Sequence, residues 1–173
     1  MELGKLQQVD LREIWPHEAN DFSKWLAKKE NMEILCEEIG LEIQIISTEA
    51  SVGSFAVDIL GEETNTGKKI IIENQLETTN HDHLGKIITY ASGLEASYII
   101  WIFKTIRDEH RRAIDWLNEV TDSEVNFFAI QMELWKIGDS SPAPKFNIIS
   151  SPNDWAKAVR QSQSSDSMSE NNV

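Results

Sequence analysis

Cysteine is nearly absent from this chain, whose 173 residues include a single one, Cys36. One cysteine excludes an internal disulfide and any zinc site built on several thiolates. Long apolar runs are also missing, since none approaches the roughly 20 residues that a membrane-spanning helix needs. The first residues do not follow the basic and then apolar pattern of a secretory signal. We therefore expect a cytoplasmic protein in a reducing compartment, without membrane contact.

Basic residues are few: 16 Lys and Arg stand against 29 Asp and Glu, so the formal net charge is −13. Proteins that coat nucleic acid without sequence preference usually carry the opposite balance, and the composition argues against that class. It does not exclude a nuclease, because clustered carboxylates are what a divalent-metal site requires. The sequence also lacks a glycine-rich phosphate loop and a Gly-x-Ser-x-Gly nucleophile turn.

A single domain is the arrangement that the chain length favours. Apolar residues make up 40% of the sequence and charged residues 26%, which is typical of a folded globular domain. We expect this domain to span residues 1–160. Residues 161–173 are polar and lack apolar spacing, so we expect them to form a disordered tail.

Strands are predicted where apolar residues alternate or run together between turn signals. They cover residues 41–48, 53–60, 69–75, 97–103, 125–137 and 145–149. Residues 97–103 (SYIIWIF) are apolar enough for a strand that is buried on both faces. Residues 61–67 contain Thr-Asn-Thr-Gly, which favours a turn between two of the strands.

Helices are predicted by apolar spacing and by terminal signals. They cover residues 16–30, with Pro16 in the first turn, residues 31–39, ended by Gly40, residues 81–93, capped by Asn80, residues 106–120, and a short segment after Ser151-Pro152. The element order is α-α-β-β-β-α-β-α-β-β-α. This order predicts an α/β domain built on a mixed sheet flanked by helices.

Two of the predicted strands carry an acid among apolar residues: Asp58 follows Ala56-Val57, and Glu73 follows Ile70-Ile71-Ile72. If the strands form a hairpin centred on Asn65 and Thr66, Asp58 lies directly opposite Glu73. Opposed side chains on one face have Cβ atoms about 4.5–5.5 Å apart, and like charges there are destabilising. A shared proton, a basic side chain or a cation must neutralise them. Two carboxylates suit Mg²⁺ or Mn²⁺, which prefer oxygen ligands.

Polar residues near this pair suggest catalytic groups. Gln75 points to the same face as Glu73, and the following helix places His83, Lys86 and Tyr90 at i, i+3 and i+7. A glutamine or lysine can orient an attacking water, and an ammonium can stabilise charge that develops on a phosphate. The alternative is structural, with Lys86 pairing Glu73 and Asp58 capping a turn.

The spacing of Asp58, Glu73-Asn74-Gln75 and Lys86-x-x-x-Tyr90 resembles the core of the PD-(D/E)XK nuclease superfamily. Several longer blocks, including VGSFAVDILGEE and IIENQLETTNHDHLGKIITYASGL, resemble a bacterial domain-of-unknown-function family assigned to that superfamily. The resemblance covers about residues 9–158. It implies a restriction-endonuclease-like fold with an αβββαβ core, and a hydrolase that uses Mg²⁺ or Mn²⁺ to cleave phosphodiester bonds of DNA.

The resemblance also implies residue roles. Asp58 and Glu73 are the expected metal ligands. Gln75 replaces the lysine that usually follows two residues after the glutamate, while Lys86 stands where branched- or mismatched-DNA nucleases of the superfamily place a glutamine. We interpret this exchange as a migrated lysine, so that the catalytic set is Asp58, Glu73, Gln75 and Lys86. A glutamate on the first helix is a further expected ligand, for which Glu18 is the first candidate and Glu49 the second.

Substrate contacts are expected from the two predicted helices beyond Glu73. The candidates are His81, His83 and Tyr90 on the first of these helices and Arg111 on the second. His81 and His83 suit hydrogen bonds to a phosphate better than a metal site, because a third ligand is not evident. Arg107 and Arg111 share a face that can hold phosphates, although neighbouring acids favour a salt-bridged, solvated surface instead.

The leading hypothesis is therefore a metal-dependent endonuclease acting on DNA. The alternative is a non-catalytic module with a nuclease fold, which binds or regulates, or a subunit of a larger DNA-processing or defence complex whose basic partner supplies affinity for DNA. Residues 127–137 can also support a homodimer. The sequence leaves open both DNA and RNA as the substrate, in single-stranded, duplex or branched form.

Overall fold

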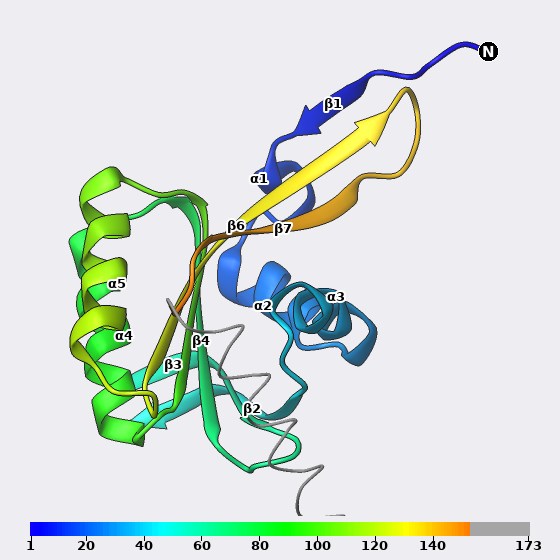
Figure 1. The fold of residues 1–173 in the computed structure, drawn as a ribbon. Coiled ribbons are helices and arrows are strands. Elements are labelled where there is room, and N and C mark those ends of the chain that lie inside the picture. Colours follow the sequence, from blue (N-terminus) through cyan, green and yellow to red (C-terminus); the bar gives the residue numbers. More distant parts are fainter. Residues whose placement is uncertain (153–173) are drawn as a thin grey trace, which may run out of the picture.

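The computed structural model describes residues 1–152 and contains one seven-stranded mixed sheet (Figure 1). The helix expected after Ser151-Pro152 and the tail at 161–173 lie outside the described residues. The strands are β1 (Leu6–Val9), β2 (Ile43–Val52), β3 (Phe55–Glu63), β4 (Lys69–Thr78), β5 (Tyr98–Thr105), β6 (Asn126–Ile137) and β7 (Ala143–Ser150). Their spatial order is β1-β6-β5-β4-β3-β2, and β7 also pairs with β6.

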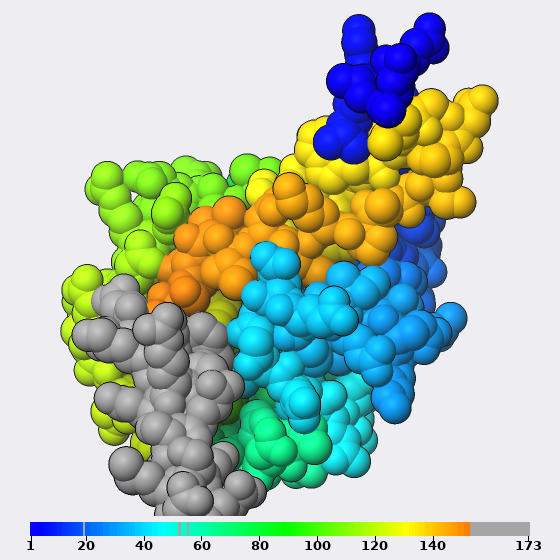
Figure 2. Space-filling model, turned by 45° about the vertical axis from the view of Figure 1, so that its right-hand side comes forward, coloured from blue at the N-terminus to red at the C-terminus, as the bar shows by residue number. Residues whose placement is uncertain are grey.

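The centre of the sheet is parallel and its outer parts are antiparallel. β5 runs parallel to both β4 and β6, and its residues 99–103 are buried. A parallel strand covered on both faces needs such a continuous apolar run, as predicted. β2, β3 and β4 form an antiparallel meander on one side. On the other side, β6 and β7 project from the body together with β1 (Figures 1 and 2).

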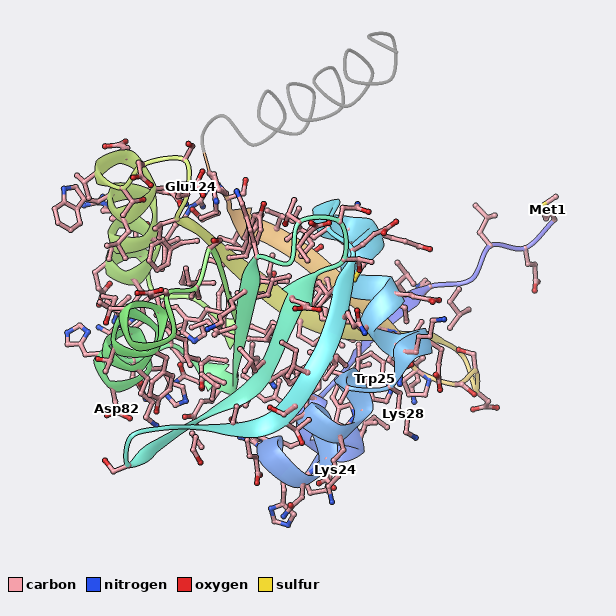
Figure 3. The ribbon with its side chains drawn as sticks, turned by 90° about the horizontal axis from the view of Figure 1, so that it is seen from below. Met1, Lys24, Trp25, Lys28, Asp82 and Glu124 are labelled. Carbon is pink, nitrogen blue, oxygen red and sulfur yellow. The ribbon has the colours of Figure 1, made fainter. Side chains whose placement is uncertain are left out.

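Helices cover both faces of the sheet. Their bounds are α1 (Leu11–Ile14), the π-helical turn η1 (Glu18–Phe22), α2 (Ser23–Leu26), α3 (Lys29–Ile39), α4 (His81–Leu94) and α5 (Asp108–Val120). The segment from α1 to α3, which carries Trp25 and Lys28, lies on one face, and α4 and α5, with Asp82, lie on the other (Figure 3).

The buried apolar residues form two clusters, one on each face of the sheet, and adjacent residues of β4 belong to different clusters. Ile72 packs in a cluster with Leu26, Leu35 and Ile100, whereas Ile71 packs in a second cluster on the face of α4 and α5. Within residues 1–152, no helix is long and apolar enough to cross a membrane.

The fold class expected from the sequence is confirmed, because α3, β2, β3, β4, α4 and β5 follow one another in the αβββαβ order. Two helix boundaries are confirmed by their capping geometry. Asn80 Oδ1 accepts a hydrogen bond from the His83 N–H at 2.9 Å, and Gly40 ends α3 in the left-handed conformation with φ 73°.

The single helix predicted over residues 16–30 is wrong. The chain forms η1 and α2 and then interrupts at Lys28, whose backbone is extended before α3. The rings of Trp15, Phe22 and Trp25 pack against one another with centroids 4.9–5.8 Å apart. This aromatic contact folds the segment onto itself, so tertiary packing overrides the continuous helical spacing.

Two strand predictions also need correction. β1 has no counterpart in the predicted order, because its sequence LQQV shows little apolar alternation and the strand is held by pairing with the end of β6. Gly53, predicted to begin a strand, lies instead in the turn between β2 and β3 with φ 60°. Strand pairing determines both the position of β1 and the turn at Gly53, and local sequence patterns do not predict either.

Candidate active site

The acidic pair lies where β3 separates from β4. The two strands pair from Glu62 opposite Lys69 to Ile59 opposite Ile72, which is the register predicted from the turn. At the next residue of each strand, bonds from main-chain N–H groups to carboxylate side chains replace the main-chain hydrogen bonds between β3 and β4. The Asp58 N–H donates to Glu73 Oε1 at 3.2 Å, and the Asn74 N–H donates to Asp58 Oδ2 at 2.8 Å. The pair is therefore anchored through main-chain donors of both strands.

A third carboxylate, that of Glu18, binds the same edge of β4. The Leu76 N–H donates to Glu18 Oε1 at 2.8 Å, and the Arg12 guanidinium donates to the same oxygen at 2.9 Å. Asn74 and Leu76 are two residues apart, which is about 6.6 Å along a strand. Asp58 and Glu18 thus occupy successive positions along one strand edge, and the structure brings Glu18 to the part of β4 that holds Glu73.

The electrostatics of the pair favour a neutralising partner. Glu73 is only 4% exposed, and its burial, together with the charge of Asp58, raises the pKa of Glu73 to about 9. Burial also raises the pKa of Asp58, against the opposing effect of the Asn74 N–H. At neutral pH the metal-free pair therefore retains a proton, as expected for two like charges that share a site.

The donor chemistry fits a hard divalent cation, because carboxylate oxygens are the ligands that Mg²⁺ and Mn²⁺ prefer. In the described part of the chain, however, no three His, Cys, Asp or Glu side chains lie close enough together to form a complete metal cluster. Asp58 and Glu73 are adjacent, whereas Glu18 is held by Leu76 and Arg12.

Gln75 is fully buried and its amide is directed along its own strand. Its Nε2 donates to the carbonyl of Thr78 at 3.1 Å and to Glu77 Oε1 at 3.4 Å. Its Oε1 is buried and has no hydrogen-bond partner among residues 1–152. An acceptor in this state is costly unless a ligand or water pairs with it, and it lies two residues from Glu73.

His83, Lys86 and Tyr90, at i, i+3 and i+7 on α4, interact electrostatically with the acidic pair. Burial raises the pKa of both Asp58 and Glu73, and the charge of Lys86 opposes this rise only in part. Its ammonium bonds to Asp82 at 3.2 Å, so the structural alternative of a direct Lys86–Glu73 pair does not describe this arrangement. Tyr90 is buried, and burial, together with the charge of Glu73, raises the pKa of its hydroxyl.

His83 is half-buried beside the same charges. Burial lowers the pKa of its imidazole, and the Lys86 charge lowers it further, whereas Glu18 and Asp58 act in the opposite direction. Its Nδ1 lies 3.0 Å from Asn80 Oδ1. A carbonyl oxygen only accepts hydrogen bonds, so Nδ1 carries the proton of the neutral ring. His83 Nε2 is then an acceptor rather than the phosphate donor expected from the sequence.

Two other candidates lie away from the pair. His81 turns toward α5, where its Nδ1 lies 2.7 Å from His110 Nε2. Arg111 is exposed on α5, where Arg112 pairs with Asp108 at 3.2 Å. This surface therefore resembles the salt-bridged, solvated surface that was the alternative to phosphate binding.

Glu49 lies between Thr48 and Ala50, which pair with Ile59 and Val57, so it is level with Asp58 on the neighbouring strand. Its φ is 53° and its side chain is exposed. A positive φ in a residue other than glycine is strained. The structure thus places the second glutamate candidate beside the pair, but on the solvent side.

Arg12 and Asn80 are site residues that sequence reasoning missed. Arg12 Nη1 and Nη2 bond to the Pro16 carbonyl and to Glu18, and Arg12 lines a polar cleft of about 530 Å³ with Leu76, Thr78 and Lys104. Arg12 lies on a four-residue helix whose sequence carries no catalytic pattern. Asn80 showed only as a helix cap. A larger cavity of about 670 Å³, between α3 and β2, is lined in part by Met32 and Cys36 and lies outside this site.

Comparison with known proteins found structural similarity only at low sequence identity. The repair endonuclease from Pyrococcus abyssi matches 51% of this chain and 43% of that chain, with 13% identity and a TM-score of 0.42. A complex of EndoMS with double-stranded DNA matches 61% and 45%, with 14% identity and a TM-score of 0.42. Pyrococcus furiosus SfsA in complex with Ca²⁺ matches 75% and 60%, with 17% identity and a TM-score of 0.39. This chain therefore spans less than two thirds of each of these proteins.

No protein-family model matches the sequence, and no curated protein matches it.

Proposed function

We propose that this protein is a PD-(D/E)XK-type endonuclease that hydrolyses phosphodiester bonds of DNA with a divalent cation. The observation that carries the proposal is the pairing of Asp58 and Glu73, a half-buried and a buried carboxylate on neighbouring strands at the point where the strands separate. A buried pair of acids costs folding free energy unless it is neutralised. The presence of such a pair in a sheet is best explained by a function that needs both charges.

Asp58 and Glu73 are the residues that would hold Mg²⁺ or Mn²⁺, with Glu18 as a further ligand at the same edge of β4. The unpaired Oε1 of Gln75 supports the fit, because a buried acceptor two residues along β4 from Glu73 can pair with a water of a hydrated cation. Such an ion, when bound, supplies Lewis-acid chemistry at a phosphate. Gln75 and Lys86 would orient water and phosphate, and the ammonium of Lys86 would counter the charge that develops on the phosphate.

The test is a cleavage assay with the purified full chain. Single-stranded, duplex and branched DNA, and matched RNA, are incubated with Mg²⁺ or Mn²⁺ beside the variants Glu73→Gln and Asp58→Asn. We expect cleavage by the wild type and a loss of about 10²–10³-fold in each variant, since removal of electrostatic stabilisation at one position typically costs 10²–10³. Cleavage that survives in both variants would refute the proposal.

A second candidate function is an assembly role, as a homodimer or as a subunit of a larger DNA-processing complex. Leu6 and Ile137 face each other across β1 and β6, and they are 66% and 53% exposed on the projecting strands. Exposed apolar pairs on a strand edge favour a partner surface. Sedimentation at rising protein concentration tests the homodimer. DNA binding that requires an added partner, without binding by the chain alone, would favour the larger complex.

A further inference from the structure

The proposed hydrolysis needs a group that takes a proton from the attacking water, and the residue at the usual lysine position does not provide one. Gln75 carries an amide, whose nitrogen has no basic lone pair. Its Nε2 is already committed to Thr78 and Glu77 on its own strand. Gln75 can therefore orient a water molecule, but it cannot accept its proton.

Lys86, the residue interpreted as a migrated lysine, is held in its charged form. Its ammonium lies 3.2 Å from Asp82 one turn earlier on α4. Partial burial acts to lower the pKa of Lys86, but the bond to the Asp82 carboxylate outweighs it and the pKa is raised. A lysine in this state stabilises negative charge and has no free lone pair for a proton.

His83, unlike Lys86, has a ring nitrogen that can accept a proton. Asn80 Oδ1 accepts both the main-chain N–H and the ring Nδ1–H of His83, at 2.9 Å and 3.0 Å. Because this oxygen is an acceptor in both bonds, the neutral ring presents an unprotonated Nε2. The ring is half-buried, and burial and the charge of Lys86 lower the pKa of its imidazole, against the opposing charges of Glu18, Asp82 and Asp58. A fixed tautomer of this kind is what general-base catalysis requires of a histidine.

We propose that His83 is the catalytic base of this site, and that Asn80 orients it. The inference rests on the proposed function, because it assigns a role in that hydrolysis. His83 Nε2 accepts a proton from water while the water oxygen forms the new bond to phosphorus. The bond from phosphorus to the sugar oxygen breaks with its electron pair on that oxygen, which takes a proton from solvent. The imidazolium of His83 then returns its proton to solvent.

The first test is the tautomer itself, which can be measured without any substrate. Long-range ¹H–¹⁵N correlation spectra of the full chain, at about pH 7.5 and above the ordinary histidine pKa, report which ring nitrogen carries the proton. The chain has four histidines, so single His→Gln variants assign the signals. We expect His83 to be protonated at Nδ1 alone. A ring protonated at Nε2, or at both nitrogens, would overturn the proposal.

The second test is single-turnover cleavage by His83→Ala, with the DNA dissociation constant measured in parallel. We expect a rate loss of about 10²–10⁴-fold, which is the range for removal of a general base, with DNA binding changed by less than about threefold. Added imidazole should restore part of the rate, and the restoration should follow the free-base form as pH rises. His17→Ala is the control, because His17 is exposed and has no role in the acidic pair or its substrate contacts.

The outcomes separate the two proposals. Cleavage that needs Glu73 but continues at the wild-type rate in His83→Ala overturns the role of His83 and leaves the nuclease proposal intact. Loss of cleavage without imidazole rescue, together with weakened DNA binding, also overturns it and makes His83 a binding residue. A wild-type chain that cleaves none of the DNA or RNA forms with either cation overturns the nuclease proposal, and the catalytic role of His83 with it.

Discussion

The main-chain N–H of Asp58 donates to the carboxylate of Glu73 at 3.2 Å, so each acid of the pair is tied to the strand of the other. The reciprocal bond runs from the Asn74 N–H to the Asp58 carboxylate at 2.8 Å. These bonds stand where ladder bonds between β3 and β4 would continue. The sheet thus opens at one point and fills the opening with carboxylates, which keeps both acids in a defined position despite their mutual repulsion.

The stability of the metal-free protein should depend on pH through Glu73. The pKa of Glu73 is about 9 in the folded chain and about 4.5 in the unfolded chain. Between these values the folded chain holds one proton more, so the free energy of unfolding falls as pH rises, by about 1 kcal/mol per pH unit. The contribution of protonated Glu73 to the free energy of unfolding is fully present below about pH 4.5 and is lost as pH rises toward 9.

Urea unfolding in a chelator, over this pH range, measures the effect. Glu73→Gln should flatten the curve and raise the free energy of unfolding at pH 7 by on the order of 2 kcal/mol. Glu77→Gln is the matched control, because Glu77 lies exposed on the same strand. A Glu73→Gln variant with the same pH slope as the wild type would contradict the assignment.

Divalent cations should stabilise the wild type. A cation at 100 times its dissociation constant adds about 2.7 kcal/mol, which corresponds to a rise in Tm of about 5–10 °C for a chain of this size. Asp58→Asn should be more stable than the wild type in chelator, because repulsion is relieved, and should lose the response to Mg²⁺ and Mn²⁺. Differential scanning calorimetry at constant ionic strength, set with NaCl, makes this comparison. An equal rise in Tm in both proteins would place the cation elsewhere.

Glu18 should contribute charge to the site beyond its hydrogen bond. Glu18→Gln retains an oxygen that accepts the Leu76 N–H, so we expect the fold to persist, while cation affinity measured by calorimetric titration falls about 10–100-fold. Glu13→Gln provides the control, because Glu13 is exposed and lines the neighbouring cleft without bonding to β4. If both variants bind the cation equally, Glu18 acts only as an anchor for the strand edge.

The register of the acidic pair was predictable because the signals are local. Asn65 and Thr66 lie in a short turn, and once a turn is located the antiparallel register follows by counting. The same holds for α4, whose cap at Asn80 stands directly before its apolar spacing. In both cases, residues that are neighbours in sequence determine the geometry.

The remaining features of the site depend on contacts that the sequence does not encode locally. Glu18 reaches Leu76 across 58 residues, and nothing in the pattern around Arg12 points to Glu18 as its partner. The orientation of Gln75 along its own strand depends on the carbonyl of Thr78. The tautomer of His83 follows from its ring bond to Asn80, which the capping pattern in the sequence does not predict. Sequence therefore predicted the register that brings Asp58 and Glu73 together, but not the departure of His81 and Arg111 or the hydrogen bonds that determine the chemistry of the site.

His110, on α5, is a buried histidine between two polar groups. It is 2% exposed, and its ring nitrogens lie 2.7 Å from Thr79 Oγ1 and from His81 Nδ1. Thr79 Oγ1 also accepts the Arg107 N–H at 3.0 Å. This chain of bonds joins the start of α4 to the start of α5. Burial lowers the pKa of His110 below its usual value, and the neighbouring His81 lowers it further.

Because the unfolded chain takes up this proton first, the free energy of unfolding should fall as pH drops below about 6.5. His110→Gln, which can donate and accept but does not titrate, should remove that part of the pH dependence. Thr79→Val, which deletes only the hydroxyl partner, should cost about 1–3 kcal/mol at neutral pH. His17→Gln, an exposed histidine, is the control. A pH slope in His110→Gln equal to that of the wild type would show that another group titrates instead.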